Sequence, residues 1–534
     1  MEVNALYAES YLQFIAKSAS LTKVNTLKDI VYLINEDTLW EDPQSALDLN
    51  NVAVIALIEA EQCENLDMRV NYLEMAFEAL DRGARMNSHP LCLIHLALFH
   101  SLIGEYQQSI NLSYSALINI LQPAYTTENK VPFGLIYIPS KCRGSVGSNY
   151  EKFEQIFKAD DGYSQSLLLL GEVLFQSKLV SYTVTGLQIL HLAAQLLPNS
   201  ASINFQLGVA NLLSKQWEGL LYLHRARKLA PESVSILQAL YLAYRDLEQV
   251  EVADFWLNAA RNLAQSKNLN WHWDALTVNS QFMYVPFEES LIIAVQPSFQ
   301  SVVTNVLITE GDWFEPEIEL WRHWLKPGMT VIDVGANVGV YTFSAAQRVG
   351  SEGCVLAVEP FSGCVSCLSE TRKINNLSWV KIFAGAASNR NGTARLSIHR
   401  ASELNQIIVN DLEENQELNN IEEVPCFSLD SLTEQENISH VDLMKIDVEN
   451  HEMQVLIGSE RILNNYFPTI IYETTGSDHL SVAKHLRNKG YQLFIYKPYV
   501  EQLIPVTSDE SFNNQINIIA IHSYKLNNVN VSTK

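Results

Sequence analysis

The sequence predicts a chain of two parts, an α-helical solenoid followed by an α/β domain. Three observations support this fold class. Residues 1–270 show helical periodicity with a repeat of 33 to 34 residues, strand-like and helical stretches alternate from about residue 275, and the first five strand-like runs are continuously apolar. Such apolar runs are typical of buried parallel strands, and the alternation of strands and helices predicts a doubly wound sheet.

The helical repeat is visible in small residues and prolines at regular positions. Pro198 and Pro231 are 33 residues apart, and Ala193, Ala226 and Ala260 are separated by 33 and 34 residues. Small residues let two helices pack closely, and a proline ends the second helix of a unit. The stretch SASINFQLGVANLLSKQWEGLLYLHRARKLAPE resembles a tetratricopeptide repeat. An irregular helical solenoid of another type is the alternative.

Turn-forming residues and changes of pattern set the expected boundaries. Pro, Gly, Ser and Asn within 121–162 predict a long loop or insertion, and residues 1–50 are expected to cap the array. The apolar stretch 290–308 predicts a small strand pair ahead of the sheet. The expected parts are a helical region at 1–270, a connecting segment at 271–300, an α/β domain at 301–525 and a polar tail at 526–534.

Composition limits the partners and the compartment. The 534-residue chain has a formal net charge of −24 and no run of Lys and Arg, so nucleic acid and anionic membranes are poor partners. The N-terminal MEVNALYAESYLQF has neither the basic start nor the apolar core of a signal peptide. No apolar run reaches the ~18 residues that a membrane-spanning helix requires. We therefore expect a cytoplasmic protein.

The seven cysteines are scattered, and Cys364 and Cys367 form a lone CxxC pair within a predicted helix. A structural zinc site needs a second pair of ligands, which the sequence lacks. The cysteines are therefore expected to be structural or incidental.

The strongest chemical signal is VIDVGANVGVYTF, in which a predicted strand ends at Asp333 and turns into a helix through Gly335, Asn337 and Gly339. Glycine permits a sharp turn and a close approach of a ligand, and the helix N-terminus offers free N–H groups to a carboxylate. Dinucleotide-binding turns prefer glycine at the position of Asn337. The pattern DxGxNxG instead suits the amino-acid end of S-adenosylmethionine, and an ordinary strand-to-helix turn is the alternative.

A second acid strengthens this interpretation. Glu359 ends the next predicted strand, 26 residues after Asp333. An acid at this place can accept hydrogen bonds from both hydroxyls of a ribose. The alternative is a solvent-facing glutamate at a strand end. Together the two acids predict a cofactor that carries an adenosyl group.

A third cluster lies in VDLMKIDVENHEMQVLIG, where Lys445, Asp447 and Glu449 alternate at the end of a predicted strand. Open α/β sheets bind their ligands at this end of their strands. Polar residues in a buried strand are costly unless they are paired, so Lys445 is expected to pair with a neighbouring carboxylate. A purely structural ion pair with a helix cap is the alternative.

Residues from about 300 to 522 resemble the FkbM-type methyltransferase family. The matching pieces, in family order, are Phe314-Glu315-Pro316, Lys326-Pro327-Gly328 before VIDVGANVG, Glu359-Pro360, Ala386-Ala387-Ser388, Leu429-Asp430-Ser431-Leu432, LMKIDVEN with Glu452, IIYE ending in Glu473, and Gly490-Tyr491. The resemblance implies a Rossmann-like domain that transfers a methyl group from S-adenosylmethionine, usually to an oxygen of a small molecule or a sugar. The chain departs from the family at Asn450, where the family commonly has glycine; asparagine tolerates left-handed backbone.

This activity would require a group that removes the proton of an acceptor hydroxyl. Asp447 is the first candidate, His451 the second and Glu449 the third, although His451 is equally compatible with a plain position on a helix surface. The helical repeats are expected to recruit a protein partner or a small-molecule or glycan acceptor.

Two alternatives compete with this function. One is a non-catalytic scaffold in which helical repeats are fused to an inactive methyltransferase-like domain. The other is a metal-assisted O-methyltransferase, in which Asp447, Glu449 and Glu473 supply oxygen ligands for magnesium. Nothing in the spacing of these acids demands a metal, so the prediction includes none.

Overall fold

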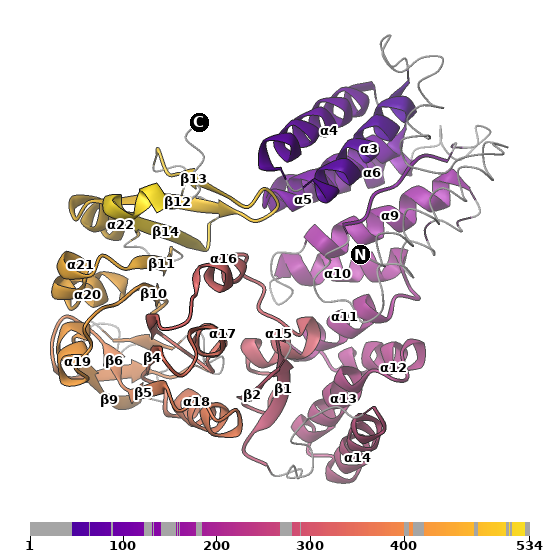
Figure 1. Cartoon of the computed structure of the whole chain (residues 1–534). Coiled ribbons are helices and arrows are strands. Elements are labelled where there is room, and N and C mark those ends of the chain that lie inside the picture. The colour runs from indigo at the N-terminus through magenta and orange to yellow at the C-terminus, as the bar shows by residue number, and fades with distance from the viewer. Residues whose placement is uncertain are drawn as a thin grey trace. The chain divides into compact units, whose positions relative to one another are not determined.

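The computed structural model describes most of the chain, in two compact units that are treated separately (Figure 1). One unit comprises the chain up to Ala210 together with Leu221–Pro231, and the other comprises Asn211–Leu220 and the chain from Glu232 onward. None of the described helices is both long and apolar enough to cross a membrane. The described residues are 45–63, 65–86, 89–121, 131, 133–139, 156, 159, 161–177, 184–267, 280–288, 290–399, 405–408, 421–474, 479–508, 512 and 515–528.

The first unit is helical, as the periodicity predicted. Helices α3 and α4, α5 and α6, and α9 and α10 pack against each other in consecutive pairs. Ala193 and Ala226 of the 33-residue period are fully buried, and Pro198 and Pro231 follow the ends of α10 and α12. The tetratricopeptide solenoid stays a prediction. The helices are α3 (Ala46–Gln62), α4 (Leu66–Met86), α5 (Pro90–Leu102), α6 (Tyr106–Ile120), α9 (Gly162–Ser177), α10 (Val184–Leu196), α11 (Ala201–Leu213) and α12 (Gly219–Leu229).

The predicted insertion at 121–162 is described only in part. Its described stretch 133–139 is neither helix nor strand, and it is hydrogen-bonded to the helices beneath it. Asn50 Nδ2 donates to the Leu135 carbonyl at 2.9 Å, and the Tyr137 N–H donates to His95 Nε2 at 3.0 Å. Most of the rest of the insertion, the expected cap up to residue 44 and the end of the polar tail lie outside the described residues.

The last helical pair, α13 (Val234–Asp246) and α14 (Val250–Ser266), belongs to the second unit. Arg245 donates to the carbonyls of Pro297 and Ser280 at 2.7 and 3.1 Å. Asp246 Oδ2 accepts a hydrogen bond from the Phe299 N–H at 3.0 Å. These bonds attach α13 to the segment that leads into the α/β domain.

The predicted strand pair at 290–308 is only half correct. The strands are β1 (Met283–Phe287) and β2 (Leu291–Val295), paired antiparallel, whereas 302–310 forms helix α15 (Val302–Glu310). Ser301 Oγ accepts from the Thr304 N–H at the start of α15, and Gly311 ends it in a left-handed conformation. These caps override the β propensity of the Val-rich stretch.

An eight-stranded sheet forms the core of the second unit, in the order β13-β12-β14-β11-β10-β3-β4-β5. All five strands that the sequence predicted as parallel are parallel, and β14 is antiparallel between β11 and β12. The strand order reverses beside β3, and such a switch point is where open α/β sheets bind ligands. The strands are β3 (Thr330–Val334), β4 (Cys354–Glu359), β5 (Val380–Ala384), β10 (Leu443–Ile446), β11 (Thr469–Glu473), β12 (Tyr491–Lys497), β13 (Gln502–Pro505) and β14 (Asn517–His522).

A second, four-stranded sheet was not predicted from the sequence. Its order is β6-β9-β7-β8, and it begins directly after β5. The strands are β6 (Ala386–Ala387), β7 (Gly392–Ser397), β8 (Gln406–Ile407) and β9 (Ile421–Phe427). Ser388, which follows β6, donates its N–H to the Phe427 carbonyl at 2.9 Å.

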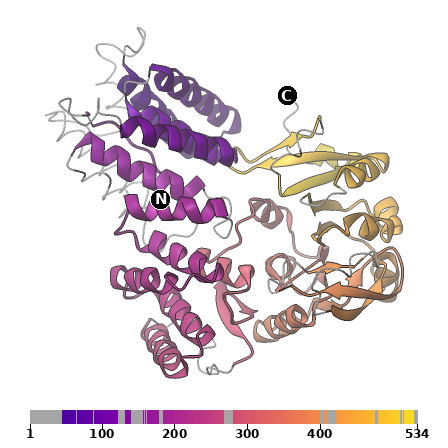
Figure 2. The ribbon, with the colours of Figure 1, turned by 180° about the vertical axis from the view of Figure 1, so that it is seen from behind.

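Helices cover both faces of the large sheet (Figures 1 and 2). One face packs a large apolar core against α19 (Leu429–Gln435), α20 (Glu452–Ile457), α21 (Glu460–Asn465) and α22 (His479–Asn488). Helices α16 (Glu317–Trp324), α17 (Val340–Val349) and α18 (Ser362–Ile374) lie on the other side. Cys364 and Cys367 are buried in α18 and form no disulfide within the described part of the chain, which agrees with a structural role.

Candidate active site

Strand alternation places the polar residues of the sheet on one face. Val334 and Ile446 belong to the apolar core, so the residues that precede them, Asp333 and Lys445, point to the opposite face. Lys445 pairs in register with Asp333 across β10 and β3. The candidate site therefore lies at the carboxyl ends of β3, β4, β10 and β11, beneath α16 and α17.

The glycine turn after β3 has the geometry that the motif predicted. Gly335, Asn337 and Gly339 all have positive φ, at 80°, 49° and 100°. A side chain at Gly335 would collide with the backbone carbonyl of Asp447, so the turn and the end of β10 meet there without room for a Cβ. Gly339 begins α17, whose N-terminus is thereby directed to the sheet edge.

Glu359 already holds this turn in the structure. Its Oε2 accepts from the Asn337 N–H and its Oε1 from the Phe361 N–H, both at 2.8 Å. Burial raises the pKa of Glu359 to about 7, although these two N–H groups favour the carboxylate. Each carboxylate oxygen has a second lone pair, so Glu359 can hold the turn and still accept from a ligand.

Asp333 is turned toward the first residues of α17. Its Oδ2 accepts a hydrogen bond from the Thr342 hydroxyl, and the residue is 2% exposed. Burial raises the pKa of Asp333 to about 6, against the opposing effect of Thr342. Asp333 therefore positions the start of α17.

Lys445 is buried and paired with a neighbouring carboxylate, as the polar interruption of an apolar strand predicted. Its Nζ donates to Asp447 Oδ2 at 2.9 Å and to Asn517 Oδ1 at 2.7 Å, and it lies 5.1 Å from the centre of the Tyr341 ring. Burial opposes the charge of Lys445, but Asp447 and Glu315 raise its pKa above the usual value.

The sequence analysis did not identify the rest of this network. Glu315 Oε2 accepts from the Tyr341 hydroxyl at 2.7 Å and from Asn517 Nδ2 at 2.9 Å, and it lies 3.8 Å from Lys445 Nζ. Asn517 Nδ2 also donates to Glu317 Oε2 at 3.4 Å. Burial and the neighbouring Glu315 raise the pKa of Glu317 to about 7. A polar residue opening the apolar run NIIAIH was the available signal for Asn517.

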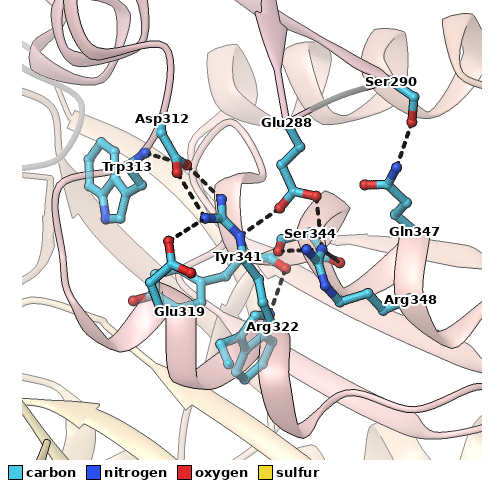
Figure 3. A network of polar contacts seen from close by, with 11 residues as sticks. Glu288, Ser290, Asp312, Trp313, Glu319, Arg322, Tyr341, Ser344, Gln347 and Arg348 are labelled. Carbon is cyan, nitrogen blue, oxygen red and sulfur yellow. Dashed lines mark hydrogen bonds and ion pairs between the residues drawn. The ribbon is translucent and has the colours of Figure 1, made fainter. Parts of the chain in front are cut away.

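An arginine clamp fixes the segment that carries Glu315 (Figure 3). Arg322 donates to both oxygens of Asp312, at 2.8 and 2.6 Å, and to Glu288 at 2.8 Å. Glu288 also accepts from Arg348 at 2.8 Å. The clamp ties the turn after β1 to α16 and α17, which restrains the approach of Glu315 to Lys445.

Three acids meet where β10 and β11 end. Oxygen atoms of Asp447, Glu449 and Glu473 lie within 4.8 Å of one another, and the three residues are partly exposed. Burial would raise the pKa of Asp447, but Lys445 holds it below the usual value. Asn450 has a φ of 71°, so it adopts the left-handed conformation expected at the position of the family's glycine.

His451 forms its hydrogen bond with a residue outside this group of acids. Its Nε2 is 3.1 Å from the Ser388 hydroxyl oxygen, and the residue is 7% exposed. Burial lowers the pKa of His451, which favours the neutral ring. The alternative of a plain position on a helix surface is therefore wrong.

The fold and the site define an open α/β domain, in which an acid–glycine turn and a strand-end glutamate meet at the switch point of the sheet. Residues 333–493 match the family model described as the methyltransferase FkbM domain. The C-terminal half of the chain thus carries an FkbM methyltransferase domain, as its motifs predicted.

The individual proteins that resemble this chain share little sequence identity with it. "Methyltransferase 1" of Beauveria bassiana (strain ARSEF 2860) is 22% identical over 185 residues, which are 32% of this chain and 74% of that protein. A SAM-dependent O-methyltransferase from Thermotoga maritima is similar to 46% of this chain and 82% of its own, at 15% identity and a TM-score of 0.24. MamA from Desulfovibrio magneticus RS-1 is similar to 41% of this chain and 98% of its own, at 17% identity and a TM-score of 0.26.

Proposed function

We propose that this chain is an S-adenosylmethionine-dependent methyltransferase that acts on an oxygen of a small molecule or a sugar. The observation that carries the proposal is the left-handed turn from Gly335 to Gly339, held by the buried Glu359. The match of residues 333–493 to the FkbM domain supports the same class of enzyme.

The residues present fit this cofactor. The N-terminus of α17 offers backbone N–H groups to the carboxylate of the methionine part, and Glu359 offers its remaining lone pairs to the ribose hydroxyls. The excess of carboxylates over ammonium groups around Lys445 suits a cationic cofactor. When bound, S-adenosylmethionine supplies an electrophilic methyl group.

On the acceptor side, Asp447 is the first candidate for the group that orients the hydroxyl and takes its proton. Its side chain is 31% exposed, so an acceptor can reach it. Lys445 keeps the carboxylate ionised and fixes one of its oxygens. Glu449 lies close enough to take over this role, and His451 remains the second candidate of the sequence analysis.

Calorimetry with S-adenosylhomocysteine tests the cofactor assignment. Glu359→Ala should weaken binding at least tenfold, because each hydrogen bond to a charged group contributes roughly 1.5–3 kcal/mol. Since Glu359 also holds the glycine turn, Glu359→Gln serves as a second variant that keeps one accepting oxygen, and Tm is measured on every preparation. Glu352→Ala, at an exposed turn of the same domain, is the matched control. Equal affinity in all four proteins would refute the assignment.

A metal-assisted reaction is the second candidate, because the structure brings Asp447, Glu449 and Glu473 together. Carboxylate oxygens are the ligands that Mg²⁺ prefers. Treatment with EDTA followed by addition of Mg²⁺ distinguishes the two reactions. A rate that falls and is then restored supports the metal, and an unchanged rate supports Asp447 acting without one.

The scaffold hypothesis differs from both by predicting no turnover. Incubation of the protein with cell extract and isotopically labelled S-adenosylmethionine, followed by mass spectrometry, decides between them. A labelled product that depends on the protein supports the enzyme and identifies its acceptor. Cofactor binding without any labelled product supports a scaffold whose helical region recruits a partner.

A further inference from the structure

Side chains from neighbouring helices of the first unit hold the main chain of the stretch 133–139. Gln165 of α9 bonds to both main-chain groups of Gly134, accepting from its N–H and donating to its carbonyl, each at 3.2 Å. Asn51 of α3 accepts from the Leu135 N–H at 2.9 Å. Because these bonds are made to main-chain groups, they can hold a peptide of this conformation whatever its side chains are.

A buried pair, Asn50 of α3 and His95 of α5, extends this recognition. Asn50 donates to the Leu135 carbonyl, and His95 Nε2 accepts from the Tyr137 N–H. Since Nε2 accepts, the hydrogen of the neutral ring is on Nδ1, which lies 2.7 Å from Asn50 Oδ1. Burial lowers the pKa of His95 to about 3, which keeps the ring neutral. The pair therefore presents one donor and one acceptor to a main chain.

This polar surface needs an occupant. Asn50, His95 and Gln165 are each 0% exposed, so water cannot replace the bonds that they make to the stretch 133–139. Buried polar groups that lose their partners are costly. The surface is therefore stable when a peptide covers it, and in this structure that peptide is a stretch of the same chain.

The side chains of the stretch add a selective pattern. Even a Cβ at Gly134 would lie 2.5 Å from Leu91 Cδ1 and 2.8 Å from Leu47 Cδ1, so a residue without a side chain fits best there. The four residues that follow are all buried. The Tyr137 hydroxyl donates to Glu61 Oε2 at 3.1 Å. The surface thus suits an uncharged peptide in which a glycine is followed three residues later by a tyrosine.

We propose that the surface formed by Asn50, Asn51, His95 and Gln165 is a binding site for a linear peptide, and that the stretch 133–139 occupies it as an exchangeable internal ligand. The partner that it fits is a segment of another protein with the same glycine–tyrosine pattern. Such a segment replaces the internal ligand and makes the same main-chain bonds, so the buried polar groups are paired in both states.

Two properties of the internal ligand favour this exchange. It is neither helix nor strand, so its release does not require an element of secondary structure to unfold. Its main-chain bonds are made to side chains, and these side chains can bond equally well to a second peptide. The inference goes beyond the proposed methyl transfer, and it holds whether or not the C-terminal domain is catalytic.

Binding of a synthetic peptide to the full-length protein tests the exchange. The probe is fluorescently labelled VPFGLIYIP, which is the sequence of residues 131–139, and anisotropy follows its binding. An internal ligand competes at a high effective concentration, so the wild-type protein should bind the probe weakly. Gly134→Val crowds the internal ligand against Leu91 and leaves the site itself intact. The affinity for the probe should then rise by about tenfold or more.

A second variant weakens the internal ligand in another way. Tyr137→Ala vacates the place of a fully buried ring, which the tyrosine of the probe can fill. This variant should also bind the probe more tightly than the wild type does. A probe with valine in place of its glycine should bind to none of these proteins. Tm, measured on every preparation, shows that each variant is folded.

A change in the site itself should reverse the gain. In the Gly134→Val protein, Gln165→Glu keeps the size of the side chain but replaces the donor to the peptide carbonyl by a carboxylate oxygen. The affinity for the probe should fall again by about tenfold, as expected for one lost hydrogen bond. Gln108→Glu, at an exposed glutamine of α6, is the matched control and should leave the affinity unchanged.

Hydrogen exchange in the wild-type protein supplies a readout that needs no variant. Mass spectrometry follows the native stretch 133–139, and ¹³C labelling of the probe keeps the two peptides apart in mass. Saturating probe should raise the exchange of the native stretch while α5 stays protected. Binding of the probe without such a rise would mean that it binds elsewhere, which would overturn the proposal.

Two further results would also overturn it. One is equal affinity for the probe in the wild type, Gly134→Val and Tyr137→Ala. The other is a wild-type dimer, seen by light scattering, that Gly134→Val converts to a monomer, because the occupant would then come from a second copy of this chain. None of these measurements uses the cofactor, so their outcome is independent of the methyltransferase assignment.

Discussion

The two faces of the large sheet are built from the same strands but have different chemistry. In β10, Met444 and Ile446 enter the apolar core, while Lys445 between them is buried among Asp447, Glu315 and Asn517. The apolar face is stabilised by burial that any well-shaped hydrophobic side chains supply. The polar face depends on specific partners, and removing one of them leaves the others buried and unpaired. We therefore expect substitutions on the apolar face to change mainly the stability of the domain, and substitutions at the exposed end of the polar face to change mainly its chemistry.

The largest expected effect is at the exposed end of the polar face. Asp447→Asn keeps the shape of the side chain but removes the base, so label transfer to extract should fall by about 10²–10⁴-fold. Affinity for S-adenosylhomocysteine should stay within a few-fold of wild type. Asp442→Asn, at the other end of the same strand, is the matched control, because its amide oxygen can still accept from the Thr330 N–H.

If Asp447 is instead only the structural partner of Lys445, Asp447→Asn should lower Tm and cofactor affinity together. A folded variant with a near-normal rate would exclude the base assignment, and Glu449 would then be the next residue to test.

The next effect is on stability. Lys445→Met removes the cation and leaves Asp447, Glu315 and Asn517 without it, so the free energy of unfolding should fall by about 3–5 kcal/mol. Chemical denaturation measures this loss. In the double variant with Asp447→Asn the loss should be smaller than the sum of the single losses, because the two groups interact. Strict additivity would contradict the pairing.

A smaller effect follows from Glu317, whose pKa is raised to about 7 in the folded protein from the ordinary 4.5. The folded state then binds the proton more tightly than the unfolded state, so stability is highest below pH 4.5 for this group and falls as the pH rises to about 7. Glu317→Gln should remove up to about 3 kcal/mol of this dependence. Tm of the wild type and of Glu317→Gln, each measured at pH 5.5 and at pH 8, checks this prediction. If the difference between the two pH values is the same in both proteins, the raised pKa of Glu317 is contradicted.

The smallest expected effect concerns the boundary between the helical region and the catalytic domain. A fragment starting at Glu232 keeps α13, whereas one starting at Gln281 loses the bonds of Arg245 and Asp246 to the segment 280–299. The shorter fragment should have a Tm several degrees lower, since each bond contributes about 0.5–1.5 kcal/mol.

Both fragments should bind S-adenosylhomocysteine. If the helical region recruits the acceptor, the fragment from Glu232 should lose turnover on the natural acceptor. Full turnover by that fragment would show that the recruitment hypothesis is wrong.

Part of this protein is determined by local sequence alone. Continuous apolar runs predicted the five parallel strands, because a strand covered on both faces excludes polar residues along its length. The acid–glycine turn and Glu359 were found from spacing, because each ends a strand and the ends of parallel strands share one edge. The left-handed backbone of Asn337 and Asn450 is also compatible with the sequence, since asparagine adopts this conformation more readily than most residue types.

The rest was decided by contacts between segments that are distant in the chain. Glu315 and Asn517 are about 200 residues apart in sequence and share a hydrogen bond, which no local pattern predicts. Stretch 302–310 became a helix because caps at both ends and burial outweighed the preference of its β-branched residues. His451 and Ser388 meet only because two strand ends and a second sheet bring them together. Pairing of this kind depends on the free energy of burying polar groups together, which exists only once the tertiary structure has formed.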